Sequence, residues 1–178
     1  MNSVHPSDRQ LIDTWASHVS GRVLDAGCGP GHWTDYLSRC GLDVQGLDIV
    51  PEFLHTARAR YPAVRFELGS IDAIDETSDS LGGVLSWFST IHHEPSQIVI
   101  PLTEFARVLH PGGTLLLGYF DGTEIEAFDH AVVRAYRWPA RELGAMLEAA
   151  GFDIIETHRR TERGRRDVGA ILCELRAR

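Results

Sequence analysis

Apolar residues along the chain alternate between short compact runs and segments of helical spacing. Helical spacing from Ser7 to about Val19 predicts a leading helix within residues 1–20, with Ser7 as its N-cap. Most of the compact runs are separated by further segments of helical spacing, which predicts a mostly parallel sheet covered by helices on both faces. The runs that predict strands are residues 22–26, 42–48, 64–68, 83–87, 114–120, 152–157 and 168–175.

Two segments near the C-terminus depart from this alternation. The last two predicted strands are joined by an arginine-rich connector with no room for a crossover helix, so they are predicted to pair antiparallel. Residues 121–138 form a polar connection of about twenty residues in which we predict neither helix nor strand, and long connections of this kind are often functional. The helix that follows begins at Pro139 and is closed by Gly151.

Composition narrows the possible classes of protein. The 178 residues, 43% hydrophobic and 24% charged, predict one α/β domain over residues 1–178 with no apolar run approaching the ~20 residues of a membrane helix. A net charge of −8 disfavours nucleic acid and favours a small molecule as the partner. Three cysteines at unrelated spacings and an N-terminus without signal-peptide character lead us to expect a cytoplasmic protein.

A glycine-rich turn between the first strand and its helix carries the chemistry. In VLDAGCGPG, residues 23–31, the backbone can approach a ligand closely at the carboxyl end of the strand. The second strand ends at Asp48, where an acidic side chain can accept hydrogen bonds from both hydroxyls of a ribose. A nicotinamide dinucleotide remains an alternative ligand, although its fingerprint requires G-x-G-x-x-G and this turn is G-x-G-x-G.

The chain resembles the class I S-adenosylmethionine (SAM) dependent methyltransferases in VLDAGCGPG, in Asp48 and in ARVLHPGGTLLL at residues 106–117. The resemblance covers nearly the whole chain. It implies a three-layer Rossmann-like sandwich with a seven-stranded, mostly parallel sheet whose last strand is antiparallel. It also implies SAM as the cofactor and S-adenosylhomocysteine as the product.

The resemblance also implies which residues bind the cofactor. Asp25 and the loop Gly27, Cys28 and Gly29 would hold the methionine end, although the Cys28 side chain itself is expected only to fill space. Asp48 would bind the ribose and Ile49 one face of the adenine. The remaining residues that would contact the cofactor are Gly69, Ser70 and Ile71 at the adenine edge, and Ser86 and Trp87 at the methionine ammonium group. The family often has aspartate where this chain has Ser70.

Histidines beyond the fourth strand are the candidates for proton transfer. A hydroxyl acceptor must lose a proton, and His92 is the residue that we expect to act as general base, with His93 beside it contacting the acceptor. The alternative is that both histidines only cap the next helix.

The acceptor is expected to contact the connection 121–138 and the end of the fifth strand. The candidate residues are Tyr119, Tyr136, Arg137 and Trp138, which suit an aromatic or anionic acceptor but are equally typical of packing. The five arginines between residues 159 and 166 resemble an anion-binding patch, yet we favour a solvated hairpin tip.

Missing motifs restrict the reaction further. The chain has no Asn-Pro-Pro-Tyr tetrapeptide and no Pro-Cys nucleophile, and Asp121 alone does not make a carboxylate cluster, so no metal is expected. These observations favour O- or N-methylation of a small molecule. A protein that binds SAM to sense or to scaffold, without turnover, is the alternative from a different class.

Overall fold

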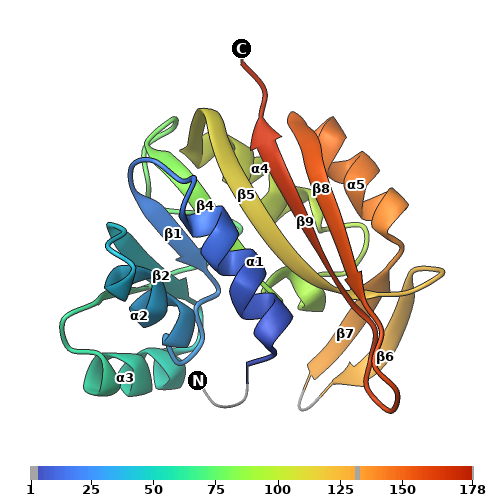
Figure 1. Cartoon of the computed structure of the whole chain (residues 1–178), viewed down its shortest axis with the longest axis horizontal. Helices are drawn as coiled ribbons and strands as arrows, with labels where there is room; N and C mark the ends of the chain where they lie inside the picture. The colour runs from blue at the N-terminus through green and yellow to red at the C-terminus, as the bar shows by residue number, and fades with distance from the viewer. Residues whose placement is uncertain (1–3, 131–132, 178) are drawn as a thin grey trace.

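The computed structural model describes residues 4–130 and 133–177 and contains one nine-stranded sheet between helices (Figure 1). Five strands run parallel in the order β3-β2-β1-β4-β5. These strands are β1 (Val23–Ala26), β2 (Val44–Asp48), β3 (Arg65–Leu68), β4 (Leu81–Trp87) and β5 (Leu109–Asp121).

The C-terminal hairpin has the predicted direction. Strand β8 (Phe152–Arg160) pairs antiparallel with β9 (Val168–Leu175), and β9 pairs antiparallel with β5. The last strand is therefore antiparallel to its neighbours, and the predicted Rossmann-like α/β fold is confirmed.

The prediction of seven strands was wrong, because the connection 121–138 contains a second hairpin. Its strands are β6 (Glu126–His130) and β7 (Val133–Trp138), and β7 pairs with the end of β5. Charged side chains are interspersed among the apolar ones on these short, half-exposed strands, which makes the segment resemble a polar loop in sequence. Residues 131 and 132, within the predicted connection, lie outside the described residues.

Helices cover both faces of the sheet. The first face carries α1 (Pro6–Ala16) and α2 (His32–Arg39), whose apolar side chains pack with Leu85 and Leu116 of the sheet. The opposite face carries α4 (Val99–Val108) and α5 (Ala140–Ala149), which pack on the larger core. The remaining helix, α3 (Pro51–Arg60), packs against β3, and a single 3-10 turn forms at Thr90–His92.

The start of α1 differs from the prediction. His5, and not Ser7, is the N-cap, because the Ser7 backbone NH donates to His5 Nδ1 at 3.2 Å and Pro6 occupies the first helical position. Among the described residues, no helix has both the length and the apolar character needed to cross a membrane.

Candidate active site

A pocket of about 390 Å³ lies at the carboxyl ends of the parallel strands, between the turns that follow β1, β2, β3 and β4. This edge is where doubly wound folds bind nucleotides. Two groups of predicted site residues meet there: residues predicted to bind the cofactor, and the two histidines predicted to act on the methyl acceptor. The predicted residues that line the pocket are Gly27, Gly29, Asp48, Ile49, Gly69, Ser70, Ile71, His92 and His93.

The glycine-rich turn brings backbone to the floor of this pocket. The backbone of Gly27 has φ of +78°, a conformation that residues other than glycine rarely adopt. A Cβ at Gly27 would also lie 2.2 Å from the Ser89 Cβ, so the segment directly after β4 passes close over the turn. The NH groups of Gly27 and Cys28 donate to the Leu47 carbonyl at 2.8 and 2.9 Å, which ties the end of β1 to the end of β2.

Asp48 is buried at the end of β2 and already orders the turns around it. Its Oδ2 accepts a hydrogen bond from the Gly29 NH at 2.7 Å, and its Oδ1 accepts one from the Val50 NH at 2.8 Å. Each carboxylate oxygen has a further lone pair, so the group can still accept hydrogen bonds from a ligand in the pocket.

Asp25 lies behind the pocket wall and not on it. Its side chain accepts a hydrogen bond from Thr34 Oγ1 at 2.6 Å, and the residue is 2% exposed. Burial, with a smaller contribution from the charge of Asp48, raises the pKa of Asp25 to about 7. The carboxyl group is therefore poised to ionise near neutral pH.

Three other predicted cofactor residues also lie outside the pocket lining. Cys28 and Ser86 are buried, and Ser86 Oγ is 2.8 Å from Ser89 Oγ. The Trp87 ring packs edge-on against that of Trp33, with ring centroids 6.3 Å apart. Contact between these three side chains and a ligand stays a prediction. The same holds for the cofactor roles of the residues that line the pocket and of Asp25.

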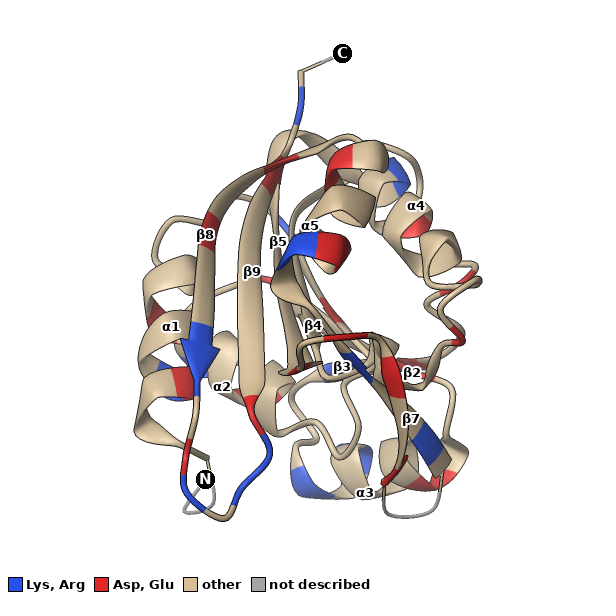
Figure 2. Cartoon of the chain, turned by 90° about the vertical axis from the view of Figure 1, so that its right-hand side faces the viewer, with Lys and Arg blue, Asp and Glu red and all other residues tan. Residues whose placement is uncertain are grey.

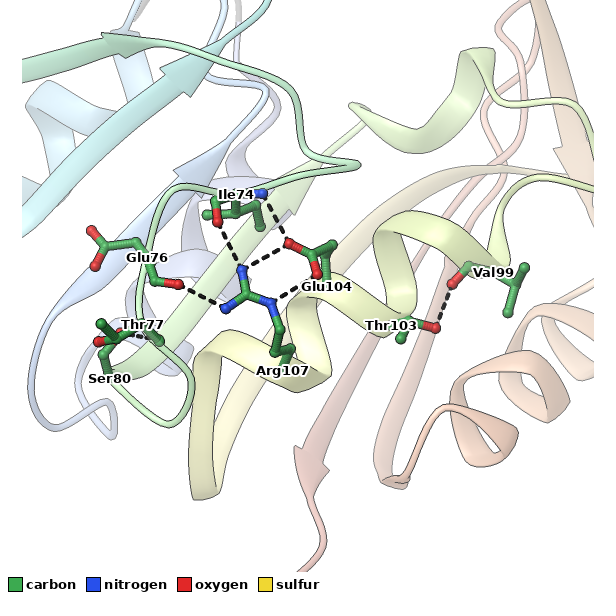
Figure 3. Close-up of polar contacts among 8 residues, drawn as sticks. All are labelled: Ile74, Glu76, Thr77, Ser80, Val99, Thr103, Glu104 and Arg107. Atoms are coloured by element: carbon green, nitrogen blue, oxygen red, sulfur yellow. Dashed lines mark hydrogen bonds and ion pairs between the residues drawn. The ribbon is translucent and has the colours of Figure 1, made fainter.

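The loop after β3, which carries Ser70 and Ile71, is anchored by a residue to which the sequence assigned no role. The guanidinium of Arg107 donates to the carbonyls of Ile74 and Glu76, both at 2.7 Å, and pairs with Glu104 (Figure 3). Glu104 in turn accepts from the Ile74 NH at 2.9 Å. Arg107 is the arginine of ARVLHPGG, so this motif fixes one wall of the pocket from helix α4.

The two histidines form hydrogen bonds with different parts of the chain. His92 Nδ1 lies 2.7 Å from the Arg134 carbonyl of β7. His93 Nε2 lies 2.8 Å from an Asp72 carboxylate oxygen, on the opposite side of the pocket. Helix α4 begins at Val99 with no side-chain cap, so neither imidazole caps it. The capping alternative is therefore wrong.

Family comparison addresses the part of the chain that builds this pocket. A family model described as a methyltransferase domain matches residues 23–113, from β1 into β5. The chain belongs to this family. The resemblance found in its sequence motifs is thereby confirmed.

Individual relatives agree with the family. The chain is 36% identical over 106 residues to a malonyl-[acyl-carrier protein] O-methyltransferase of Erwinia billingiae, which covers 59% of this chain and 41% of that protein. It is 30% identical over 139 residues to a ubiquinone biosynthesis O-methyltransferase of Xanthomonas campestris pv. campestris, covering 74% of this chain and 57% of that one. The chain thus spans about half the length of these curated relatives.

A solved structure shows the same fold. The 1,6-didemethyltoxoflavin-N1-methyltransferase of Burkholderia thailandensis, with its substrate and S-adenosylhomocysteine bound, matches with a TM-score of 0.80 at 22% identity. The match covers 97% of this chain and 78% of that one.

Of the four aromatic and basic residues predicted to contact the acceptor at the end of β5 and in the connection 121–138, three are buried. Tyr119, Tyr136 and Trp138 belong to the core between the sheet and helices α4 and α5. Arg137 forms an ion pair with Glu126 across the β6–β7 hairpin at 3.0 Å. Burial favours packing for the first three, and the acceptor roles of all four stay predictions.

A line of aromatic rings in tilted and edge-on contact, which was not predicted from the sequence, extends from the pocket towards the hairpins. Phe88 packs on Phe120, and Phe120 packs on Phe128 and His130, with ring centroids 5.1 to 5.3 Å apart. The His130 ring lies 5.7 Å from that of His92. Phe88 lines the pocket and has φ of +59°, a strained backbone conformation typical of functional sites.

Proposed function

We propose that this chain binds SAM and transfers its methyl group to a hydroxyl or amino group of a small molecule. The observation that carries the proposal is the convergence of the glycine turn, Asp48 and two histidines on one pocket in a member of the methyltransferase family. The volume of this pocket, about 390 Å³, lies within the range typical of small-molecule sites.

The lining of the pocket fits this cofactor. The Asp48 carboxylate would accept hydrogen bonds from the ribose hydroxyls, and the glycine turn would present backbone to the methionine end. Ile49 and Phe53 are exposed apolar side chains on the pocket wall and would cover the faces of a purine. The Asp25 carboxylate would stabilise the ammonium group through the turn that it underlies. When bound, SAM supplies an electrophilic methyl group on a sulfonium.

The general base in this proposal is His92. A carbonyl oxygen only accepts hydrogen bonds, so His92 must donate to the Arg134 carbonyl. In the neutral imidazole, the hydrogen is therefore on Nδ1. Nε2 then carries the free lone pair. Nε2 would accept the proton of the acceptor hydroxyl, while bound SAM would supply the methyl group and would keep the electron pair of the C–S bond on sulfur. The rest of the rate enhancement comes from holding the two reactants in line.

Binding and turnover test different parts of the proposal. Calorimetric titrations with SAM, S-adenosylhomocysteine and NAD establish the ligand, and binding of NAD without SAM would refute the proposed cofactor. Supplying labelled SAM together with fractionated metabolite extracts then identifies the methylated product. Binding of SAM with no labelled product in any fraction would support the sensing or scaffolding alternative.

A further inference from the structure

A second, larger cavity lies between the two hairpins on the acceptor side of the sheet. This groove has a volume of about 910 Å³ and is lined by the end of β5 with the turn after it, by β6 and β7, and by the β8–β9 connector with the strand ends on either side of it. Figure 2 shows arginine in that connector and in β7, which Figure 1 places at the same end of the sheet. Neither hairpin forms the groove alone. The arginines that line it are Arg137, Arg159, Arg160, Arg165 and Arg166.

Four of these arginines are neutralised by carboxylates. Arg137 pairs with Glu126 as described above, Arg159 pairs with Asp121 at 2.6 Å, Arg160 pairs with Asp8, and Arg165 pairs with Glu162 at 3.3 Å. These four groups contribute little net charge to the groove.

Arg166 differs from the other four. It donates to the Asp129 carbonyl at 3.2 Å, and its guanidinium carbon lies 4.7 Å from the centroid of the Phe128 ring. In the described part of the chain it has no carboxylate partner. A stacked guanidinium with free donors is a group that binds a planar carboxylate or a phosphate.

Asp121 supplies a second, independent indication of a ligand. Its side chain is 2% exposed, and its Oδ2 is held by Arg159. Its Oδ1 is buried and has no hydrogen-bond partner among the described residues. A buried carboxylate oxygen without a partner costs free energy, so this oxygen favours a ligand that brings an N–H or O–H group into the groove.

The groove is separated from the cofactor pocket by one layer of aromatic rings. Phe120 lines the groove, Phe88 lines the pocket, and the centroids of their rings are 5.1 Å apart. The groove therefore lies next to the proposed methyl-transfer site, across these two side chains.

We propose that this groove binds the methyl acceptor and that the acceptor carries an anionic group, a carboxylate or a phosphate, beside a hydrogen-bond donor. Arg166 binds the anionic group, and Asp121 Oδ1 accepts from the donor. The inference rests on the proposed function, since it identifies the groove with the acceptor site of a methyltransferase.

Calorimetry with matched probes tests the proposal. The probes are 4-hydroxybenzoate, its uncharged analogue 4-hydroxybenzamide, and phenyl phosphate, each titrated with and without S-adenosylhomocysteine. We expect both anions to bind and the amide to bind at least about tenfold more weakly, because a charge-assisted hydrogen bond is lost. Arg166→Gln should weaken both anions by at least about tenfold. Arg163→Gln is the matched control, an exposed arginine of the same connector that does not line the groove.

The donor site has its own variant. Asp121→Asn should weaken 4-hydroxybenzoate and leave phenyl phosphate, which has no hydroxyl donor, nearly unchanged. Thermal unfolding of each variant without ligand identifies any loss of fold, in which case Arg166→Lys, which keeps the charge but loses the fork of donors, replaces Arg166→Gln.

Three outcomes would overturn the inference: no binding of either anion at millimolar concentration, equal binding of the acid and the amide, or unchanged anion binding in Arg166→Gln. Failure of the proposed function is a separate result. It would appear as absence of SAM and S-adenosylhomocysteine binding in the wild-type protein, whatever the anions do.

Discussion

The two halves of the sheet build their parts of the candidate site in different ways. In the half matched by the methyltransferase family model, the pocket is built mainly by turns directly after parallel strands. In the other half, the groove exists only because the β6–β7 hairpin and the β8–β9 connector lie against each other. Short segments therefore specify the cofactor pocket, whereas tertiary packing specifies the groove. The family model ends early in β5, and a substrate-specific site is most easily varied in the part of the chain beyond it.

The largest expected effect comes from changing His92. This residue joins the two halves, because it follows β4 and its side chain is hydrogen-bonded to the Arg134 carbonyl of β7. His92→Ala should lower the rate of methyl transfer to a hydroxyl acceptor by ~10²–10⁴-fold and leave SAM affinity nearly unchanged. His93→Ala should lower it much less, because His93 is held by Asp72 on the cofactor side. Steady-state rates across a pH series provide the measurement. Equal rates for the wild-type protein and His92→Ala would show that positioning alone supplies the catalysis.

A smaller effect is expected within the cofactor half. Asp48→Ala should weaken SAM binding by ~1–3 kcal/mol, because ribose hydroxyls and two backbone NH groups lose their acceptor. Calorimetry measures the affinity, and circular dichroism checks that the fold survives. An unchanged dissociation constant would refute the ribose role of Asp48.

The pH dependence of cofactor binding should be weaker still and should depend on Asp25. Because burial raises its pKa to about 7, the carboxyl group stabilises the fold fully below pH ~4, and this contribution is lost as the pH rises through 7. A cationic ligand favours the ionised form, so SAM affinity should increase about tenfold from pH 6 to pH 8. Asp25→Asn should remove both trends. An equally steep increase in that variant would assign the pH dependence to another group.

The smallest effect tests the charges of the acceptor half. Glu126→Gln removes the carboxylate that pairs with Arg137, and both side chains are at least one third exposed. We expect the free energy of unfolding to fall by less than ~1 kcal/mol, as measured by urea denaturation. A larger loss would mean that the ion pair, and not the antiparallel backbone pairing, holds β6 to β7.

Sequence alone predicted most of the cofactor half because its signals are local. The VLDAGCGPG turn and Asp48 each lie at the end of a buried strand, so the fold brings them to one edge without any further information. The β6–β7 hairpin was missed because its strands bury only a few side chains. The position of Arg166 on Phe128 was beyond prediction, since only packing of two distant hairpins brings these residues together.

Arg107 gives the cofactor pocket a mechanical link to helix α4. The Ile74 amide lies in a segment without regular structure, yet its hydrogen is held by Glu104 and its carbonyl by Arg107. Exchange of this amide with solvent therefore requires the loop and the helix to separate, so the two open as one cooperative unit. A change in the packing of α4 would in this way alter how often the loop after β3 opens, even though no residue of α4 lines the pocket.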